Sequence, residues 1–446
     1  MMEIRDLFIT PLLLLLVYAG AYAIRPYLTD RVNVRYFIPG LTAKIVGALA
    51  VGFIYQFYYG RGDTFTYFHL GSKYVWEAFK DSPALAFKLI FAGSEYTNDT
   101  FQYASKIYTY GDSSSYFVVR IAGLFDILTL HTYSATAVLF ALVCFGGMWA
   151  MFKVFYQLFP AQHLGMAIAI LFVPSVFFWG SGLLKDTITI GALGWATYCI
   201  YSIFILRRSI VLCSIILLIS FYTIYTVKIY ILLCFLPAAI LWIMYTKMHQ
   251  VRNVVLKVMI APFLLTLTGV LGYFSIVKVG EDNPRYNVEN IASTAKVTAE
   301  WLHYVSEMQG GSAYTLGDYD YSPVGMVKKF PRAVWVSLYR PYLWEVHNVV
   351  MLLSALESLA LLLFTGYVFF KVGFGRAIAL ITSSPILIFC FLFSIIFAFA
   401  VGISTYNFGS LVRYKIPLYP FFVSGLFILL SYAKSKRKFE ALELTE

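Results

Sequence analysis

A long apolar run of the chain is interrupted by Pro174-Ser175-Val176-Phe177-Phe178-Trp179-Gly180-Ser181-Gly182-Leu183-Leu184-Lys185-Asp186. Residues 166–206 are otherwise almost continuously apolar, and about 40 such residues suffice for two membrane spans. Charged groups at this depth are costly, so Lys185 and Asp186 indicate a functional site. The plainer interpretation is an ordinary hairpin turn in which Lys185 reaches up to the membrane interface.

Composition also places the chain in a membrane. Hydrophobic residues make up 60% of it, charged residues only 13%, and the mean hydropathy is +0.75. A soluble domain carries about 25% charged residues. We therefore predict an all-α fold: a polytopic helical integral membrane protein with one transmembrane domain over residues 1–446.

Hydropathy predicts about eleven transmembrane helices. They cover residues 7–24, 41–59, 133–159, 164–179, 187–206, 209–226, 229–245, 253–277, 349–370, 377–400 and 414–432. The first is interpreted as a retained span, because no small-residue cleavage site follows it. Residues 117–130 are short and contain Arg120 and Asp126, so we expect an interfacial or re-entrant helix there.

Lysine and arginine in short loops set the orientation of such a protein. The basic tail at 434–438 is the strongest cytoplasmic signal, and it places the N-terminus outside. The polar segment 60–132 then becomes a first outer-face region with interfacial helices. Residues 278–348 become an outer-face cap, and the loop 401–413 lies on the same side.

Several other residue classes carry no function of their own. The net charge of +11 comes from basic loop residues that act as topology signals, so no nucleic-acid partner is expected. All five cysteines lie in apolar runs and are typical of small core residues. The six histidines show no paired metal-ligand spacing, so we predict no histidine or cysteine metal site.

The first polar motif directly follows the predicted span 41–59 and reads Tyr58-Tyr59-Gly60-Arg61-Gly62-Asp63-Thr64-Phe65-Thr66-Tyr67-Phe68-His69. Gly60 and Gly62 permit a tight exit from the helix. Asp63 then lies among aromatic residues at the membrane edge, where it could act as a base or bind a divalent cation. The alternative is that Asp63 is the N-cap of a helix running through Trp76.

Two late motifs add cations on the predicted outer face. Arg340 and Glu345 lie in a proline-broken, aromatic segment with Trp344, and arginine suits bidentate phosphate recognition. Arg413 lies outside, against the positive-inside bias, and so calls for an anionic partner. An interfacial aromatic belt or a salt bridge to the cap are the plainer alternatives. Together Lys185, Lys228, Arg340 and Arg413 could bind a lipid-linked diphosphate.

This arrangement resembles polyprenyl-phosphate-dependent membrane glycosyltransferases of the GT-C type. It also resembles bacterial O-antigen and exopolysaccharide polymerases. The resemblance rests on many spans, an early Gly-Asp motif on the outer face, a late cap and arginines at the membrane edge. It implies cell-envelope polysaccharide biosynthesis in a bacterial inner (plasma) membrane, with a polyprenyl-linked saccharide and membrane lipid as partners.

The resemblance implies a role for each candidate residue. Asp63 would be the base or a cation ligand, and Asp186 and Glu345 would orient cations or contact sugar hydroxyls. Lys185, Lys228, Arg340 and Arg413 would bind the diphosphate, while Tyr67 and Trp344 stack on sugar rings. Two other classes stay open: a transporter or flippase of lipid-linked saccharides, and a non-catalytic membrane assembly subunit.

Overall fold

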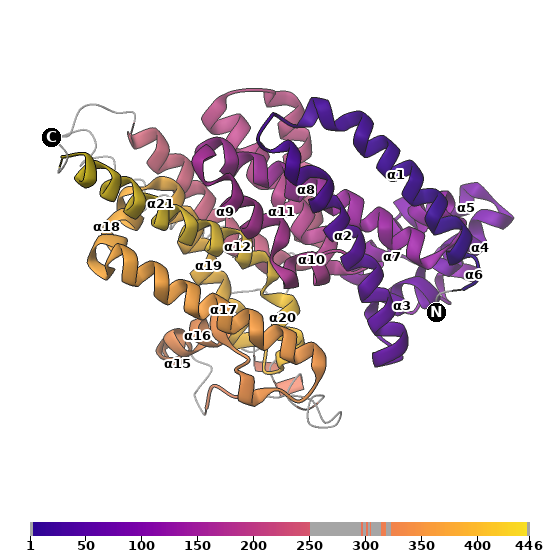
Figure 1. Ribbon diagram of the computed structural model, residues 1–446. Helices are drawn as coiled ribbons and strands as arrows, with labels where there is room; N and C mark the ends of the chain where they lie inside the picture. Colours follow the sequence, from indigo (N-terminus) through magenta and orange to yellow (C-terminus); the bar gives the residue numbers. More distant parts are fainter. Residues whose placement is uncertain are drawn as a thin grey trace. The chain divides into compact units, whose positions relative to one another are not determined.

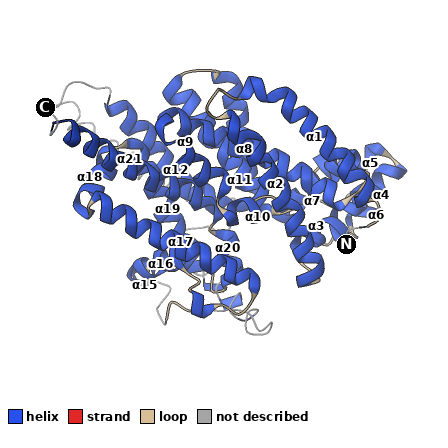
Figure 2. Ribbon diagram, in the orientation of Figure 1, coloured by secondary structure: helices blue, strands red, loops and turns tan. Residues whose placement is uncertain are grey.

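The structure is a computed structural model that describes residues 3–249, 314–317 and 323–443, with residues 296, 297, 300, 301 and 304. The fold is all-helical, with 84% helix and no strand in this described part of the chain (Figure 2). Eight described helices are long and apolar enough to cross a membrane. They are Asp6–Leu28, Val34–Tyr59, Tyr133–Leu158, Lys185–Leu206, Ile210–Met248, Val349–Val372, Pro385–Ser404 and Phe408–Ala433. The prediction of an integral membrane protein is therefore supported.

The predicted spans differ from these helices at 164–179, at 209–245 and at 377–400, the last because α18 (Phe374–Ser383) ends before the spanning helix begins at Pro385. Residues 164–179 do not form one helix. Pro174 has no backbone N–H to continue the hydrogen bonding of the preceding helix, and it begins a new helix instead. The spans predicted at 209–226 and 229–245 are both in α12 (Ile210–His249), which has one non-helical residue at Lys228. Residues 253–277 and most of the predicted cap lie outside the described residues.

The chain divides into two compact units. The first contains Met1–Leu158, Ile170–Ile203 and Arg208–Ile229. The second contains Phe159–Ala169, Phe204–Arg207 and Tyr230–Glu446.

The core of the first unit is formed by α2 (Val34–Ile54), α8 (Tyr133–Leu158) and α11 (Lys185–Ile200). Gly147 and Gly191 allow α8 and α11 to approach closely, since a Cβ on Gly147 would collide with the Gly191 carbonyl. The helix α10 (Pro174–Trp179) packs on α2. The first helix, α1 (Asp6–Leu28), runs along α2 and α8 (Figure 1).

In the sequence between α2 and α8, the predicted outer-face region of the first unit forms a group of short helices (Figure 1). They are α3 (Asp63–Tyr67), the π-helical turn Phe68–Ser72, α4 (Lys73–Asp81), α5 (Pro83–Phe91), α6 (Phe101–Ala104) and α7 (Ser113–Thr129). The helix α7 matches the segment that we predicted as interfacial or re-entrant, and with 17 residues it is not among the eight long helices.

In the second unit, α16 (Phe330–Tyr339) packs against α17 (Val349–Val372) and α19 (Pro385–Ser404). The helices α19 and α16 approach closely at Gly402, where a Cβ would collide with the Ala333 carbonyl. The second unit also contains the part of α12 from Tyr230 to His249. Its other described α-helices are α9 (His163–Ala167), α15 (Pro323–Lys328), α18 (Phe374–Ser383), α20 (Phe408–Tyr414) and α21 (Tyr419–Glu443).

Candidate functional site

The break at 180–184 is a buried turn between α10 and α11. Residues Gly180 to Leu184 are all buried, and a Cβ on Gly182 would lie 2.8 Å from the Val51 side chain of α2. The turn itself is therefore covered by protein, while the Lys185 side chain that follows it is 20% exposed, so both the functional and the plainer interpretation of this lysine stay predictions. Irregular backbone at membrane depth needs such protein cover, because its polar groups have no water to bind.

Lys44 of α2 holds this turn in place. Its ammonium donates to the Val176 carbonyl at 3.0 Å and to the Gly180 carbonyl at 2.8 Å, while Cys144 donates to the same Gly180 carbonyl. The last carbonyls of a helix have no partner inside the helix, so a cation at this end is favourable. Lys44 is completely buried, and our sequence analysis missed it. The cost of a charge inside the span 41–59 was the signal that could have found it.

Lys185 and Asp186 point to different partners. The Lys185 ammonium donates to Ser114 Oγ at 2.6 Å and lies 3.5 Å from the Asp112 carboxylate. Asp186 forms an ion pair with Lys228, the residue at which α12 loses its helical geometry. The side chains of the second pair are only 2% and 8% exposed, whereas those of Lys185 and Asp112 are 20% and 53% exposed. One pair is therefore internal and the other is open to solvent.

Asp112 also begins α7, where its side chain accepts from the Ser114 backbone N–H. Partial burial of the carboxyl favours its neutral form, but the hydrogen bond from Ser115 and the charge of Lys185 outweigh this effect. The pKa of Asp112 is therefore lowered, and the carboxylate stays ionised near neutral pH.

Asp63 is the first residue of α3 and is exposed. The preceding Gly60 and Gly62 have φ values of 72° and 151°, in the region that favours glycine, as expected for a tight exit from α2. A Cβ on Gly62 would also collide with the ring of Tyr55. The N-cap is Gly62, so Asp63 does not occupy the capping position that the alternative interpretation assigned to it.

The Asp63 motif and the break are brought to the same end of α2. Tyr55 faces Gly62 on one side and forms an edge-on ring contact with Trp179, with centroids 6.4 Å apart, on the other. Trp179 is the last residue of α10, directly before the buried turn. Two motifs that are more than a hundred residues apart in the sequence thus share one buried tyrosine.

Behind Asp63 lies a polar network that our sequence analysis did not single out. Asp126 is fully buried and accepts hydrogen bonds from Thr136 Oγ1 and from His131 Nδ1, each at 2.8 Å. The His131 ring stacks on Phe68 with centroids 4.1 Å apart. Nearby, burial lowers the pKa of His69 to about 4. Tyr67, predicted to stack on a sugar, is only 6% exposed.

In the second unit, Arg340 is surrounded on its polar and apolar sides. Its guanidinium binds both carboxylate oxygens of Glu345, with Nε 3.0 Å from Oε2. The rings of Tyr314, Tyr342 and Phe408 lie 4.9–5.7 Å from the guanidinium carbon. The pair is therefore a bidentate one that three aromatic rings shield from water.

The buried lysine Lys415 bonds the backbone of Arg340. Lys415 is 1% exposed and donates to the Arg340 carbonyl at 2.9 Å and to Ser358 Oγ at 3.2 Å. Trp344 projects outward instead, with 80% of its surface exposed, and stacks on Tyr342 at 4.7 Å. Arg413 lies half-buried in the last turn of α20.

The candidate residues are thus distributed over both units. The first holds Asp63, Tyr67, Lys185, Asp186 and Lys228, and the second holds Arg340, Trp344, Glu345 and Arg413. In the first unit Asp186 pairs with Lys228 and Lys185 pairs with Asp112, and in the second unit Arg340 pairs with Glu345. The convergence of all the candidate residues on one pocket stays a prediction. Among the described residues, no group of three or more His, Cys, Asp or Glu side chains could hold a metal ion.

Comparison with protein families, with curated proteins and with solved structures finds no match for this chain.

Proposed function

We propose that the protein is a membrane glycosyltransferase or polysaccharide polymerase that uses a polyprenyl-phosphate- or diphosphate-linked sugar at the outer face of a bacterial inner membrane. The observation that supports this proposal most is the shared position of the Asp63 motif and the Lys185 break around Tyr55. Sugar transfer from a lipid diphosphate requires a carboxylate and a cation that the substrate can reach, and Asp63 is exposed while the Lys185 side chain is 20% exposed.

In this proposal the two ends of the substrate meet different groups. Asp63 takes the proton from the acceptor hydroxyl, or holds a divalent cation, and Lys185 stabilises the departing phosphate. Lys185 suits the second role because its carboxylate partner, Asp112, is half exposed. A phosphate could take the place of Asp112 without leaving a buried charge unpaired.

The candidate residues of the second unit are an aromatic surface and a guanidinium. Trp344 is exposed and rigidly stacked on Tyr342, so it offers a flat apolar face to a sugar ring. Arg340 and Arg413 remain the candidates for a second phosphate contact. A phosphate at Arg340 would have to share its guanidinium with the Glu345 carboxylate, to which the guanidinium is hydrogen-bonded in the free protein.

The experiment is a transfer assay with purified protein and a labelled polyprenyl-diphosphate sugar. We expect Asp63→Asn to express normally and to lose at least about a hundredfold in activity, the scale of a lost general base. Asp99→Asn is the matched control, since Asp99 is also an exposed carboxylate of the region 60–132. Equal activity of the two variants would remove Asp63 from the mechanism.

Arg340 is tested in the same assay by Arg340→Lys, with Arg332→Lys as the control from the exposed face of α16. Lysine keeps the charge and loses the planar fork. We expect weaker donor binding for the first variant only. Wild-type kinetics for Arg340→Lys would restrict this arginine to its structural pair with Glu345.

A transporter or flippase is the second candidate, and one observation favours it. The buried pair Asp186–Lys228 joins two irregular points, the start of α11 after the break and the non-helical residue of α12. Broken helices that carry paired charges are typical of transporters. Translocation of the labelled lipid without a change in its bonds would support this class. If the protein shows neither transfer nor translocation, that result would support a non-catalytic assembly subunit.

A further inference from the structure

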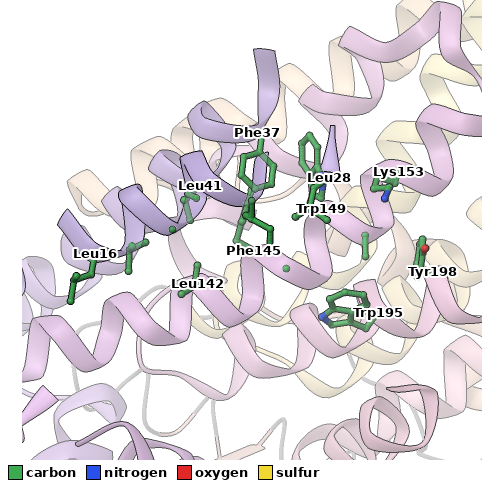
Figure 3. Close-up of a pocket in the computed structure, with 16 residues that line it drawn as sticks. Leu16, Leu28, Phe37, Leu41, Leu142, Phe145, Trp149, Lys153, Trp195 and Tyr198 are labelled. Carbon is green, nitrogen blue, oxygen red and sulfur yellow. The ribbon is translucent and has the colours of Figure 1, made fainter. Parts of the chain in front are cut away.

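The first unit contains an apolar groove that the proposed function does not use. It encloses about 630 Å³ and is lined by α1, α2, α8 and α11. This volume lies within the range of ligand pockets, roughly 300–1,000 Å³. Figure 3 shows Leu16 at one end of the groove, Phe37, Phe145 and Trp149 along it, and Lys153 with Tyr198 at the other end.

The groove runs along the helices rather than across them. Its lining on α8 extends from Leu142 to Lys153, which is about 16 Å at 1.5 Å per residue. On α1 it extends from Leu16 to Leu28, which is about 18 Å. One leaflet contributes half of a hydrocarbon core of roughly 30 Å, so the groove matches the depth of a single leaflet.

The walls keep this space open. Hydrogen bonds hold α1 at Thr10, which contacts Ser134 of α8, and at Tyr18, which bonds Thr42 of α2 at 2.8 Å. Beyond Tyr18 the lining residues of α1 include Gly20 and Ala21, and those of α8 include Gly146. A Cβ on Gly20 would meet no atom within 4 Å. The gap therefore follows from small residues between fixed contacts.

One end of the groove carries a positive charge. The Lys153 ammonium lies over the Tyr198 ring at 5.9 Å, and it forms no ion pair with any residue that the structure describes. Asp30 is an acid whose charge acts on this ammonium. The Asp30 carboxylate is already occupied by the backbone N–H groups of Val32 and Asn33, by the Asn33 amide and by the Tyr156 hydroxyl.

We propose that this groove binds an anionic phospholipid, with an acyl chain between α1 and α8 and the headgroup phosphate at Lys153. The apolar length matches one leaflet, and the cation stands where the headgroup of that leaflet would lie. Long lysine side chains reach the interface in this way, and a basic residue there attracts anionic lipids.

This site is separate from the proposed catalytic one. Tyr133, at the other end of α8, bonds Thr64 of the Asp63 motif at 2.7 Å. Lys153 lies twenty residues further along α8, so about 30 Å separate the two ends. The groove lipid therefore belongs to the leaflet opposite the Asp63 motif, and the inference holds whether or not the protein transfers sugars.

Native mass spectrometry of the full-length protein with defined lipids tests this inference. The probes are phosphatidylglycerol, phosphatidylcholine and a polyprenyl phosphate at equal concentration. We expect preferential retention of phosphatidylglycerol, and a loss of about fivefold in its affinity for Lys153→Ala, the effect of one basic residue near an anionic surface. Lys371→Ala is the matched control, because Lys371 also ends a span over a tyrosine ring, at 5.8 Å.

A second pair of variants tests the apolar part without touching the charge. Gly20→Leu fills the groove, whereas Gly366→Leu of α17 adds the same side chain at another exposed helical glycine with no atom within 4 Å. We expect only Gly20→Leu to reduce phosphatidylglycerol retention. Equal retention of both phospholipids, selective retention of the polyprenyl phosphate, or unchanged binding in Lys153→Ala and Gly20→Leu would each overturn the proposal.

Discussion

The buried ion pair between Asp186 and Lys228 offers the sharpest test of how the first unit is built. We expect Asp186→Asn and Lys228→Met to destabilise the protein strongly as single substitutions, and much less when combined. Each single substitution leaves one charge in a site where only 2% or 8% of the side chain is exposed. The double substitution leaves none.

The magnitudes follow from the cost of burying charge. Removing one partner of a buried pair costs about 3–5 kcal/mol, whereas replacing both with groups of similar volume is often close to neutral. Two single losses of about 3–5 kcal/mol each and a nearly neutral double substitution together give a coupling free energy of about 6–10 kcal/mol between the two positions. The pair Lys73–Glu77 is the control, since its side chains are 47% and 33% exposed. Its coupling should stay below about 0.5 kcal/mol.

The assay is reversible unfolding in detergent, followed by tryptophan fluorescence for the four variants of a double-mutant cycle. If the single substitutions add to the double within about 0.5 kcal/mol, the two charges do not depend on each other and the reasoning is refuted. The double variant also separates stability from function. A stable but inactive double variant would give the pair a role in the reaction cycle.

Three further predictions concern topology, packing and pH. A cysteine introduced at the exposed Asn98 should react with an impermeant reagent in intact cells, while one introduced at the exposed Arg208 should not. The native cysteines give little background, because all five are buried. Labelling at Arg208 alone would show that the predicted topology is inverted. Gly147→Ala should destabilise the protein by about 1–3 kcal/mol or more in the same unfolding assay, because its Cβ would collide with the Gly191 carbonyl. Burial lowers the pKa of His69 from 6.5 to about 4, so on acidification the unfolded chain binds the proton before the folded chain does. The free energy of unfolding should therefore fall as the pH drops from 6.5 to 4. His69→Gln should remove this pH dependence.

Those features of the fold that depend on local pattern could be predicted from the sequence. Mean hydropathy and span length indicate a helical membrane protein, and the structure supports this class. The glycines before Asp63 do adopt the positive φ values that a tight exit requires. The separation of the predicted spans 209–226 and 229–245 also falls at Lys228, the one non-helical residue of α12.

The partners of the charged residues could not be predicted, because they are set by packing between distant segments. Lys185 meets Asp112 and Ser114 only because α11 begins beside the start of α7. Lys44 meets Gly180 across 136 residues of sequence. Our diphosphate pocket expected Asp186 and Glu345 to orient the cations without assigning partners. The structure pairs Asp186 with Lys228 and Glu345 with Arg340, and it pairs Lys185 with Asp112, which we had not predicted.

These pairings change what a phosphate would have to do in order to bind. At Lys228 it would displace Asp186 and leave a carboxylate inside the unit, where an unpaired charge is expensive. At Lys185 it would displace Asp112, whose side chain is 53% exposed and can be solvated by water. Lys185 belongs to the break and Lys228 pairs with its neighbour Asp186, yet only Lys185 can exchange its partner at low cost. The buried pair then fixes the start of α11, and the exposed pair is the part of the break that is suited to meet a substrate.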